Sequence, residues 1–369
     1  MKKALIIATI EDFLNFETNN IKLLQNMGYQ VHVAANSLDV IRSFNMENVE
    51  KHQIDFVRNP FTVKNIVAYK QLCKLVKEIG FNVIHCHTPV GGVIGRIVAH
   101  KYHVTTIYTA HGFHFYKGAP VLNWLLYYPI ERFLARWTDI LITINKEDYE
   151  RAKKFVKGQV VRIPGVGVDT KKFADCKINK AEKRRELNVP EDSFLILSVG
   201  ELNKNKNHQT IIKVLSLLQN KQIHYVIVGT GQLKNELEIL SRKLKLEKQV
   251  HLLGYRQDIA EICKAADIFA HPSFREGLGI AVLEGMASGL PVIVSNSGGI
   301  KDYTETGKTG YCLSAKDCNG FALAIKKMYD KPEFRKKCSE YNREQAKLYD
   351  LQNTNKIMLN VYSSYLEGR

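Results

Sequence analysis

The sequence of 369 residues lacks features that define several protein classes. It has no apolar run approaching the roughly 18 residues that a membrane-spanning helix needs. Its seven cysteines include no CxxC pair and are odd in number, so we expect reduced thiols and not disulfides or zinc ligands. The start, MKKALIIATIEDF, has no small-residue cleavage site and becomes acidic at once. It indicates a buried first strand and not a secretion signal, so we expect the chain in the cytosol.

Acidic residues are also in short supply. The chain has 53 Lys and Arg against 37 Asp and Glu, a formal net charge of +16. This balance favours anionic partners. A basic nucleic-acid-binding protein is the weaker hypothesis, because no nucleic-acid motif is present and the aromatic residues cluster in one hydrophobic stretch. We therefore expect no nucleic acid partner and a peripheral association with the anionic inner surface of the cell membrane.

What the sequence does contain is an alternation of strand-like apolar runs with amphipathic helices. KALIIATI is typical of a strand buried on both faces of a parallel sheet. The alternation predicts the α/β class with doubly wound sheets, and the length predicts two domains. Pro164, Gly165 and Gly167 mark the crossing between them. We place the domains at 1–168 and 169–353, with a C-terminal helix at about 354–369 that is able to pack back on the first.

One stretch organises the second half: FAHPSFREGLGIAVLEGMASGLPVIVSNSGG, residues 269–299. Its pattern predicts a strand, a loop, a helix and another strand. The helix is expected to begin near Leu278–Gly279 and to continue to Ala287 or Ser288, because Gly289 is a typical helix stop.

Two glutamates flank the start of that helix. Glu276 precedes it and Glu284 lies inside it, which places the carboxylates about 10 Å apart along the axis. Carboxylates suit hydroxyl groups, whereas the backbone amides of Gly277, Leu278 and Gly279 suit phosphate oxygens. The arrangement predicts a ligand with a diphosphate between two hydroxylated groups. The alternative is a surface helix with two solvated glutamates.

Glycines end several strands of the second half, among them Gly200 and Gly229, where the backbone can approach a ligand closely. Lys204 and Lys206 follow Gly200 and are natural counter-charges for a diphosphate. A solvated lysine loop is the alternative.

In the first half, ligands are expected beyond the carboxyl ends of the strands. The side chains there are Thr9, His87, His111, Phe113 and His114. His85 and His87 alternate on one strand, but no third ligand lies nearby in the sequence, so we do not expect a metal. For His111 a core histidine is the alternative.

The most aromatic stretch is PVLNWLLYYPIERFLARW, residues 120–137. It predicts a core helix kinked by Pro129. The alternative is a helix with one face toward membrane lipid or a lipid-linked substrate.

Several motifs together resemble one family. REGLGIAVLE followed by MASGLPVIVSNSGG resembles the E-x7-E signature of family 4 retaining glycosyltransferases with the GT-B fold. HCHTPVGGVIGR, YTAHGFHFYKGAP, PGVGVDTKKF, SVGELNKNKNHQ and LLGYRQDI are similar to the branch that builds capsular polysaccharides and exopolysaccharides. The resemblance covers essentially the whole chain.

The resemblance implies two Rossmann-like domains facing each other across a cleft, the first binding the acceptor and the second the nucleotide-sugar. It implies that Glu276 contacts the donor sugar, Glu284 the ribose and Lys206 the phosphates. Further implied donor contacts are the amides of 277–279 and the residues around Tyr255 and Arg256, which would frame the base. His111 matches the first-domain histidine beside the transferred sugar.

The chain departs from this family in two places. Glu201 stands where the family commonly has Arg, and whether Lys204 replaces that cation is open. The first loop, ATIEDFLNFETNN, lacks the paired glycines common there, so its contact to acceptor or phosphate is unassigned.

The resemblance implies retaining transfer of a hexose or N-acetylhexosamine from a UDP-sugar to a polyprenyl-diphosphate-linked oligosaccharide. Catalysis would be electrostatic. No cofactor or metal is expected, because Lys206 and helix amides replace the metal and no Asp-x-Asp sequence occurs. The alternative is a UDP-sugar epimerase on the same fold. Motif spacing does not fix the sugar, the acceptor, the linkage or the oligomeric state.

Overall fold

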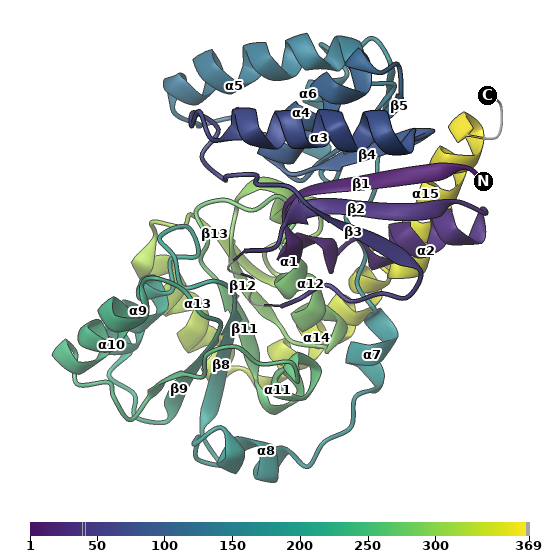
Figure 1. The fold of residues 1–369 in the computed structure, drawn as a ribbon. Coiled ribbons are helices and arrows are strands. Elements are labelled where there is room, and N and C mark those ends of the chain that lie inside the picture. The colour runs from purple at the N-terminus through teal and green to yellow at the C-terminus, as the bar shows by residue number, and fades with distance from the viewer. Residues whose placement is uncertain (39, 41, 367–369) are drawn as a thin grey trace. The chain divides into compact units, whose positions relative to one another are not determined.

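A computed structural model describes residues 1–38, 40 and 42–366, with the side chain of residue 366 left out. The chain forms two compact units (Figure 1). Unit 1 is Met1–Val166 with Gln352–Arg369, and unit 2 is Gly167–Leu351. The chain therefore passes between the units twice. That unit 1 binds the acceptor and unit 2 the donor stays a prediction.

Unit 1 is built on a parallel sheet in the order β3-β2-β1-β4-β5-β6-β7. Buried apolar side chains cover both faces of the central strands, as the continuous apolar runs predict. The strands are β1 (Lys3–Ile10), β2 (Gln30–Asn36), β3 (Val49–Gln53), β4 (Val83–His87), β5 (Thr105–Ala110), β6 (Ile140–Thr143) and β7 (Gln159–Arg162).

Helices α3, α4 and α5 contribute to the main hydrophobic core of this sheet. The helices of unit 1 are α1 (Glu11–Leu14), α2 (Thr18–Asn26), α3 (Asn65–Ile79), α4 (Pro89–Lys101), α5 (Val121–Leu134), the 3-10 helix η1 (Ala135–Trp137) and α6 (Lys146–Ala152). The last helix, α15 (Leu351–Leu366), also packs in unit 1, where Tyr362 bonds to His85 of β4. It begins earlier than predicted, and 367–369 lie outside the described residues.

Unit 2 repeats the design with a parallel sheet in the order β10-β9-β8-β11-β12-β13. Its strands are β8 (Phe194–Val199), β9 (Ile223–Val228), β10 (Val250–Leu252), β11 (Ile268–His271), β12 (Val292–Ser295) and β13 (Gly310–Leu313). Its helices are α7 (Thr170–Asp175), α8 (Lys180–Glu186), α9 (Gln209–Leu218), α10 (Lys234–Lys243), α11 (Ile259–Ala265), α12 (Ile280–Ala287), η2 (Gly298–Asp302), α13 (Cys318–Asp330) and α14 (Pro332–Lys347).

Each sheet has one point where the strand order reverses. In unit 1 it lies between β1 and β4, and in unit 2 between β8 and β11. Open α/β sheets bind ligands in the crevice beyond the strand ends at such a point. The carboxyl ends of these four strands are therefore where the functional groups are expected.

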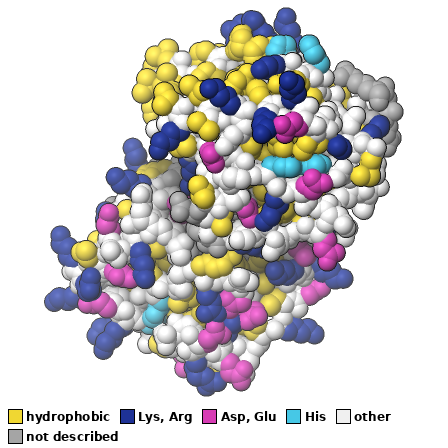
Figure 2. All heavy atoms as spheres, viewed as in Figure 1, with side chains coloured by type: hydrophobic (Ala, Val, Ile, Leu, Met, Phe, Trp, Pro, Cys, Tyr) yellow, Lys and Arg dark blue, Asp and Glu magenta, His cyan; other side chains and the backbone are white. Residues whose placement is uncertain are grey.

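The aromatic stretch of 120–137 has features of both predictions, a core helix and a helix with one exposed apolar face. Trp124, Tyr127 and Tyr128 of α5 pack against the unit 1 core. Leu122, Leu125 and Phe133, which share the opposite face by helical spacing, are 62%, 67% and 48% exposed. Figure 2 shows hydrophobic side chains gathered over this helix, with Lys and Arg beside them. Across residues 1–38, 40 and 42–366, no helix is both long and apolar enough to cross a membrane.

A buried ion pair attaches α5 to α4. Arg96 donates to the Glu131 carboxylate at 2.8 Å and to the Gly92 carbonyl at 2.8 Å. Its guanidinium lies 3.9 Å from the ring centre of Tyr108. Both charges are removed from water, so each depends on the other.

We expect Arg96→Met to lower the free energy of unfolding by about 3 kcal/mol, because it leaves the Glu131 carboxylate buried without its cation. Urea unfolding measures this change. The double variant Arg96→Met/Glu131→Leu removes both charges and should recover most of the loss. Equal losses in the single and double variants would contradict the assignment.

Candidate functional site

Two glycines allow the ends of β8 and β9 to meet. A Cβ at Gly229 would lie 2.0 Å from the carbonyl oxygen of Gly200, so no larger residue fits. A Cβ at Gly200 would lie 3.2 Å from Cε of Lys206, so glycine lets the lysine chain lie across the strand end. Gly200 and Gly229 therefore provide the space at the strand ends beside which Lys206 lies.

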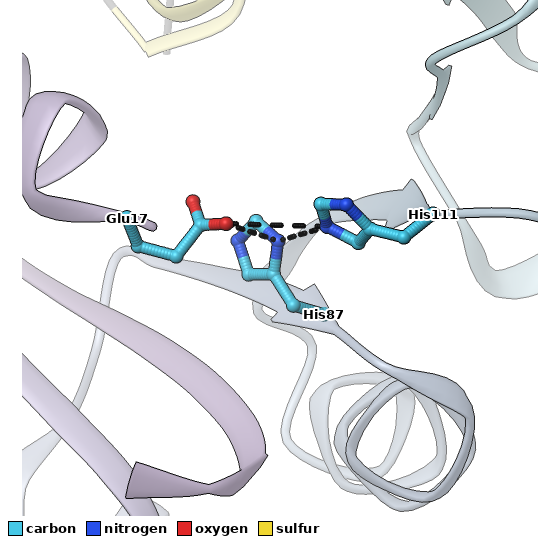
Figure 3. Close-up of side chains that lie close together, drawn as sticks. All are labelled: Glu17, His87 and His111. Atoms are coloured by element: carbon cyan, nitrogen blue, oxygen red, sulfur yellow. Dashed lines mark hydrogen bonds and ion pairs between the residues drawn. The ribbon is translucent and has the colours of Figure 1, made fainter. Parts of the chain in front are cut away.

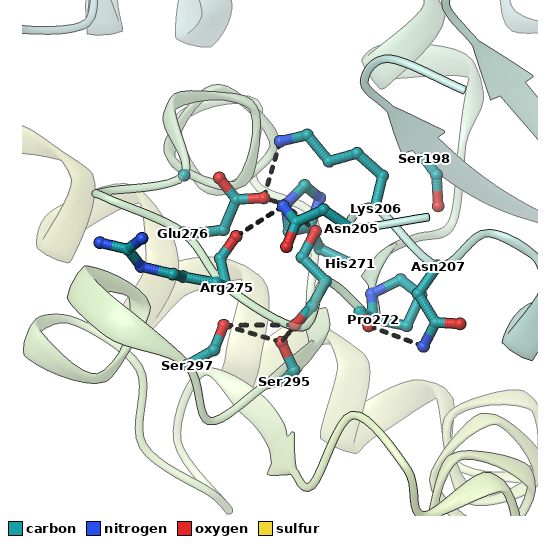
Figure 4. A network of polar contacts seen from close by, with 12 residues as sticks. Ser198, Asn205, Lys206, Asn207, His271, Pro272, Arg275, Glu276, Ser295 and Ser297 are labelled. Atoms are coloured by element: carbon teal, nitrogen blue, oxygen red, sulfur yellow. Dashed lines mark hydrogen bonds and ion pairs between the residues drawn. The ribbon is translucent and has the colours of Figure 1, made fainter. Parts of the chain in front are cut away.

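Lys206, Glu276 and His271 meet beyond the ends of β8 and β11 (Figure 4). The Lys206 ammonium lies 2.7 Å from Oε1 of Glu276, and Nε2 of His271 lies 2.9 Å from the same oxygen. The Ser273 hydroxyl lies 3.0 Å from that ring nitrogen. We call these four residues the donor-side cluster.

Hydrogen bonds from side-chain amides to backbone carbonyls hold the loops that carry the cluster. The Asn205 amide donates to the Arg275 carbonyl at 2.8 Å, and the Asn207 amide donates to the Pro272 carbonyl at 3.1 Å. At Gly298, φ is +51° and a Cβ would lie 1.7 Å from the Glu276 carbonyl oxygen. The NSGG segment predicted after β12 therefore packs directly against the backbone of Glu276.

The charge states follow from burial and from these partners. Burial by itself raises the pKa of Glu276, but His271 and Lys206 outweigh it and hold that pKa well below its usual range. Burial lowers the pKa of His271. At neutral pH the carboxylate is therefore ionised and the imidazole neutral. Because a carboxylate oxygen only accepts, the histidine proton is on Nε2.

The start of α12 differs slightly from the prediction. The helix begins at Ile280, because Gly279 has φ +84° and cannot continue a right-handed helix. First-turn amides have no partner within their own helix, and here they belong to Ile280 and Ala281. The helix therefore begins one or two residues later than predicted, and the amide of Gly279 stays at its start together with those of Ile280 and Ala281.

Glu284 lies on α12 with its carboxyl largely shielded from water. Burial raises its pKa to about 7, and Lys172 of α7 offsets only part of this effect. Its carboxylate accepts no hydrogen bond from the described residues. A hydroxyl donor of a ligand would supply one, which suits the predicted contact to ribose.

The other predicted donor residues are less constrained. Lys204 is exposed and makes no ion pair within the described residues, and Glu201 is exposed beside Asn203. Tyr255 is half exposed. Arg256 is held by Asp258 and Glu186, so a contact to the base would have to share its guanidinium with these carboxylates.

In unit 1, Glu17, His87 and His111 meet at the reversal between β1 and β4 (Figure 3). His87 Nδ1 lies 3.1 Å from His111 Nε2 and 3.2 Å from Glu17 Oε1. Glu17 and His87 are fully buried, and His111 is partly exposed. Desolvation raises the pKa of Glu17 to about 7 and lowers that of His111 to about 4. The core-histidine alternative describes His87 better than His111.

Two groups in the described residues offer three atoms that a metal could bind: Glu17, His87 and His111, and His32, Glu50 and His52. In both, the ring nitrogens already lie within hydrogen-bonding distance of each other, at 3.1 Å and 2.9 Å. A direct hydrogen bond therefore explains both pairs without an ion.

The remaining predicted acceptor-side residues have mixed positions. The Thr9 hydroxyl bonds to Thr88 at 2.6 Å and accepts from the Gly91 amide at 3.2 Å. His114 stacks on Tyr127. Phe113 is a correction: its ring is buried in the core and stacked on Phe115, so only its backbone could reach an acceptor.

Comparison with known proteins identifies the family. The model for glycosyl transferases group 1 matches residues 179–345, and the model for glycosyl transferase 4-like proteins matches residues 4–145. EpsD of Bacillus subtilis (strain 168) is 37% identical over 375 residues, covering 99% of this chain and 97% of that protein. The chain belongs to the family 4 glycosyltransferases.

Another relative of this glycosyltransferase is the UDP-Gal:alpha-D-GlcNAc-diphosphoundecaprenol alpha-1,3-galactosyltransferase of Escherichia coli. It is 33% identical over 282 residues, 74% of this chain and 73% of that protein. HepE of Anabaena, solved with UDP and glucose, has a TM-score of 0.80 at 18% identity and covers 99% of this chain and 100% of that one. Sucrose-phosphate synthase of Thermosynechococcus elongatus has a TM-score of 0.84 at 19% identity, with full coverage of both chains. These likenesses confirm the predicted GT-B fold.

Sequence reasoning missed several residues of this glycosyltransferase. His271 is the last residue of β11, where a strand end was already expected to carry function, and its position was the available signal. Asn205 and Asn207 alternate in the sequence with Lys204 and Lys206, which were predicted. Glu17 lay in the loop whose contacts were unassigned.

The two glutamates of the signature should respond oppositely to removal of their charge. Because the pKa of Glu284 is raised from 4.5 to about 7, its cost in stability is absent below pH 4.5, grows as the unfolded chain ionises, and is complete above about pH 7. Glu284→Gln should therefore raise the free energy of unfolding by about 1–3 kcal/mol at pH 8 and leave it unchanged near pH 4. Thermal and urea unfolding at the two pH values measure this.

Glu276→Gln is the matched control, because the pKa of Glu276 is depressed and its ionised form is the stable one. It should lower stability at pH 8, and the loss should shrink only as the pH falls well below 4.5. A destabilising Glu284→Gln at pH 8 would contradict the assigned environments.

Proposed function

We propose that this glycosyltransferase moves a hexose or N-acetylhexosamine from a UDP-sugar to a polyprenyl-diphosphate-linked oligosaccharide during surface polysaccharide assembly. The observation that carries the proposal is the donor-side cluster at the strand-order reversal of unit 2. There an ammonium group, an ionised carboxylate and the first turn of α12 lie beyond one sheet edge. They suit phosphate oxygens and sugar hydroxyls.

The relatives support this substrate class. The Escherichia coli relative is named for a UDP-galactose donor and a diphosphoundecaprenol-linked acceptor. HepE was solved with UDP-glucose as well as with UDP. The relatives named here are transferases, which favours transfer over the epimerase alternative. An assay without acceptor separates the two, because an epimerase would still convert its UDP-sugar.

Lys206 would serve both halves of the donor. Its ammonium has three protons, and one faces Glu276 at 2.7 Å. The other two remain for phosphate oxygens, so the lysine would link the diphosphate to the carboxylate that accepts the sugar hydroxyls. Glu284 would accept from the ribose.

We infer that transfer retains the anomeric configuration and needs no metal at the diphosphate. As the sugar departs, negative charge grows on the phosphate, and Lys206 with the amides of Ile280 and Ala281 would stabilise it. The departing phosphate would help to deprotonate the incoming hydroxyl on the same face of the sugar. His111 of unit 1 would contact the transferred sugar.

We further propose that the protein works at the cytoplasmic face of the cell membrane and that α5 contacts the lipid. The exposed Leu122, Leu125 and Phe133 lie on the same helix as Arg132, and Arg136 follows in η1. Apolar side chains beside cations suit the headgroup region of an anionic leaflet.

Lys206→Ala should reduce kcat for sugar transfer by roughly 30- to 1000-fold, the equivalent of about 2–4 kcal/mol of transition-state stabilisation. Release of UDP and the anomeric configuration of the product are measured together. Lys213→Ala removes an exposed lysine of α9 and is the matched control. Lys204→Ala tests whether this lysine supplies the cation that Glu201 does not. Unchanged turnover in Lys206→Ala and Glu276→Ala would refute the site.

The α5 proposal predicts binding to vesicles that contain an acidic phospholipid. Leu122→Glu/Leu125→Glu should weaken that binding more than about tenfold, because two leucines no longer enter the bilayer and two negative charges face its surface. Leu217→Glu changes a comparably exposed leucine of unit 2, 57% exposed, and should bind normally. Equal binding by all three proteins in a vesicle flotation assay would refute the contact.

A further inference from the structure

Glu17, His87 and His111, which we call the unit 1 cluster, share fewer protons than they have nitrogen and oxygen atoms in contact. Nδ1 of His87 faces both Oε1 of Glu17 at 3.2 Å and Nε2 of His111 at 3.1 Å (Figure 3). Oε2 of Glu17 already accepts from the Asn20 amide at 2.6 Å. A neutral imidazole carries one proton on one of its two nitrogens. The position of the His87 proton therefore decides what each neighbour must be.

The buried surroundings of His87 select that position. Its other ring nitrogen, Nε2, is buried and has no hydrogen-bond partner. A proton there would be a buried donor without an acceptor, at a cost of about 1–3 kcal/mol. A proton on Nδ1 instead has the His111 nitrogen at 3.1 Å to receive it, with Glu17 Oε1 only 3.2 Å away. His87 is thus protonated on Nδ1.

The position of the His87 proton also determines the tautomer of His111. Since Nδ1 of His87 donates, Nε2 of His111 must face it as a lone pair. The proton of neutral His111 is then on its own Nδ1, the nitrogen that no group in the described residues engages. Phe13 contacts the His111 ring edge-on at 4.8 Å, which fixes the plane of the ring.

A second set of contacts holds the cluster from behind. The ring centre of His85 lies 4.1 Å from that of His87, with the two planes tilted by 42°. Both nitrogens of His85 are engaged, by the Tyr362 hydroxyl and by Thr109, each at 2.8 Å. Within the described residues, the titratable groups that face His87 are Glu17, His85 and His111, and Tyr362 lies behind them against His85. Burial lowers the pKa of His85 to about 3, so it adds no charge.

We propose that Glu17 and His87 are positioning residues that fix His111 as the tautomer protonated on Nδ1. His111 then presents a hydrogen-bond donor on its unengaged side, suited to a hydroxyl oxygen of the transferred sugar or of the acceptor. This inference rests on the proposed function for its catalytic consequence. Its structural part, the tautomer, stands without it.

The test uses the full chain labelled with nitrogen-15 in histidine. Protonated and unprotonated nitrogens of a neutral imidazole resonate far apart, and the His111→Gln spectrum assigns the His111 signals. In wild type, Nδ1 of His111 should be protonated and Nε2 should not. In Glu17→Gln the Asn20 amide keeps the oxygen of the new side chain, so its NH2 group faces His87 and should reverse both tautomers.

Transfer kinetics supply the second readout. Glu17→Gln should lower kcat roughly 10- to 100-fold with KM changed little, as for other losses of a group that orients a functional imidazole. Glu17→Asp should restore part of the rate, because it keeps a carboxylate. Tyr362→Phe loses only a bond behind the cluster and should keep the His111 tautomer. Should Glu17→Gln fail to fold, His87→Phe removes the same donor and should leave His111 as a mixture of tautomers.

The outcomes separate the inference from the function. Absence of UDP-sugar transfer by wild type would refute the proposed function and leave the tautomer result standing. An unchanged His111 tautomer and rate in Glu17→Gln would overturn the inference. So would one tightly bound metal ion per chain that Glu17→Gln releases, since the three atoms would then be ligands.

Discussion

The ion pair between Lys206 and Glu276 is the interaction on which the edge of unit 2 at its strand-order reversal depends. It joins a loop after β8 to a loop after β11, two strands that meet where the strand order reverses. Gly200 leaves room for the lysine chain beside it, and Gly229 lets the neighbouring strand end approach. The position of the ion pair at this edge therefore depends on the space that the two glycines leave as well as on the opposite charges.

The same pair limits what the edge can bind. One ammonium and one carboxylate sum to zero, and the adjacent His271 is neutral, so the cluster alone offers no net positive charge to a diphosphate. The first-turn amides of α12 supply partial positive charge. Lys204, two residues before Lys206, is exposed and makes no ion pair within the described residues. This balance gives the departure at Glu201 a physical consequence, because the arginine missing there would have provided the surplus.

The sequence predicted two α/β units with parallel sheets, because parallel strands buried on both faces leave continuous apolar runs. It also predicted Lys206 and Glu276, whose loop positions follow from those strand ends. It could not predict that His271 binds Glu276, because this contact depends on the direction of a loop and not on spacing. The burial of the Phe113 ring was missed for the same reason.

Units 1 and 2 place a carboxyl group against a histidine at the same point of their sheets, yet the pKa values of the two carboxyl groups differ. Glu276 has Lys206 beside it and stays ionised, whereas Glu17 has an amide donor and no cation paired with it in the described part of the chain, so burial raises its pKa to about 7. One lysine thus gives the carboxyl groups of a repeated scaffold different pKa values.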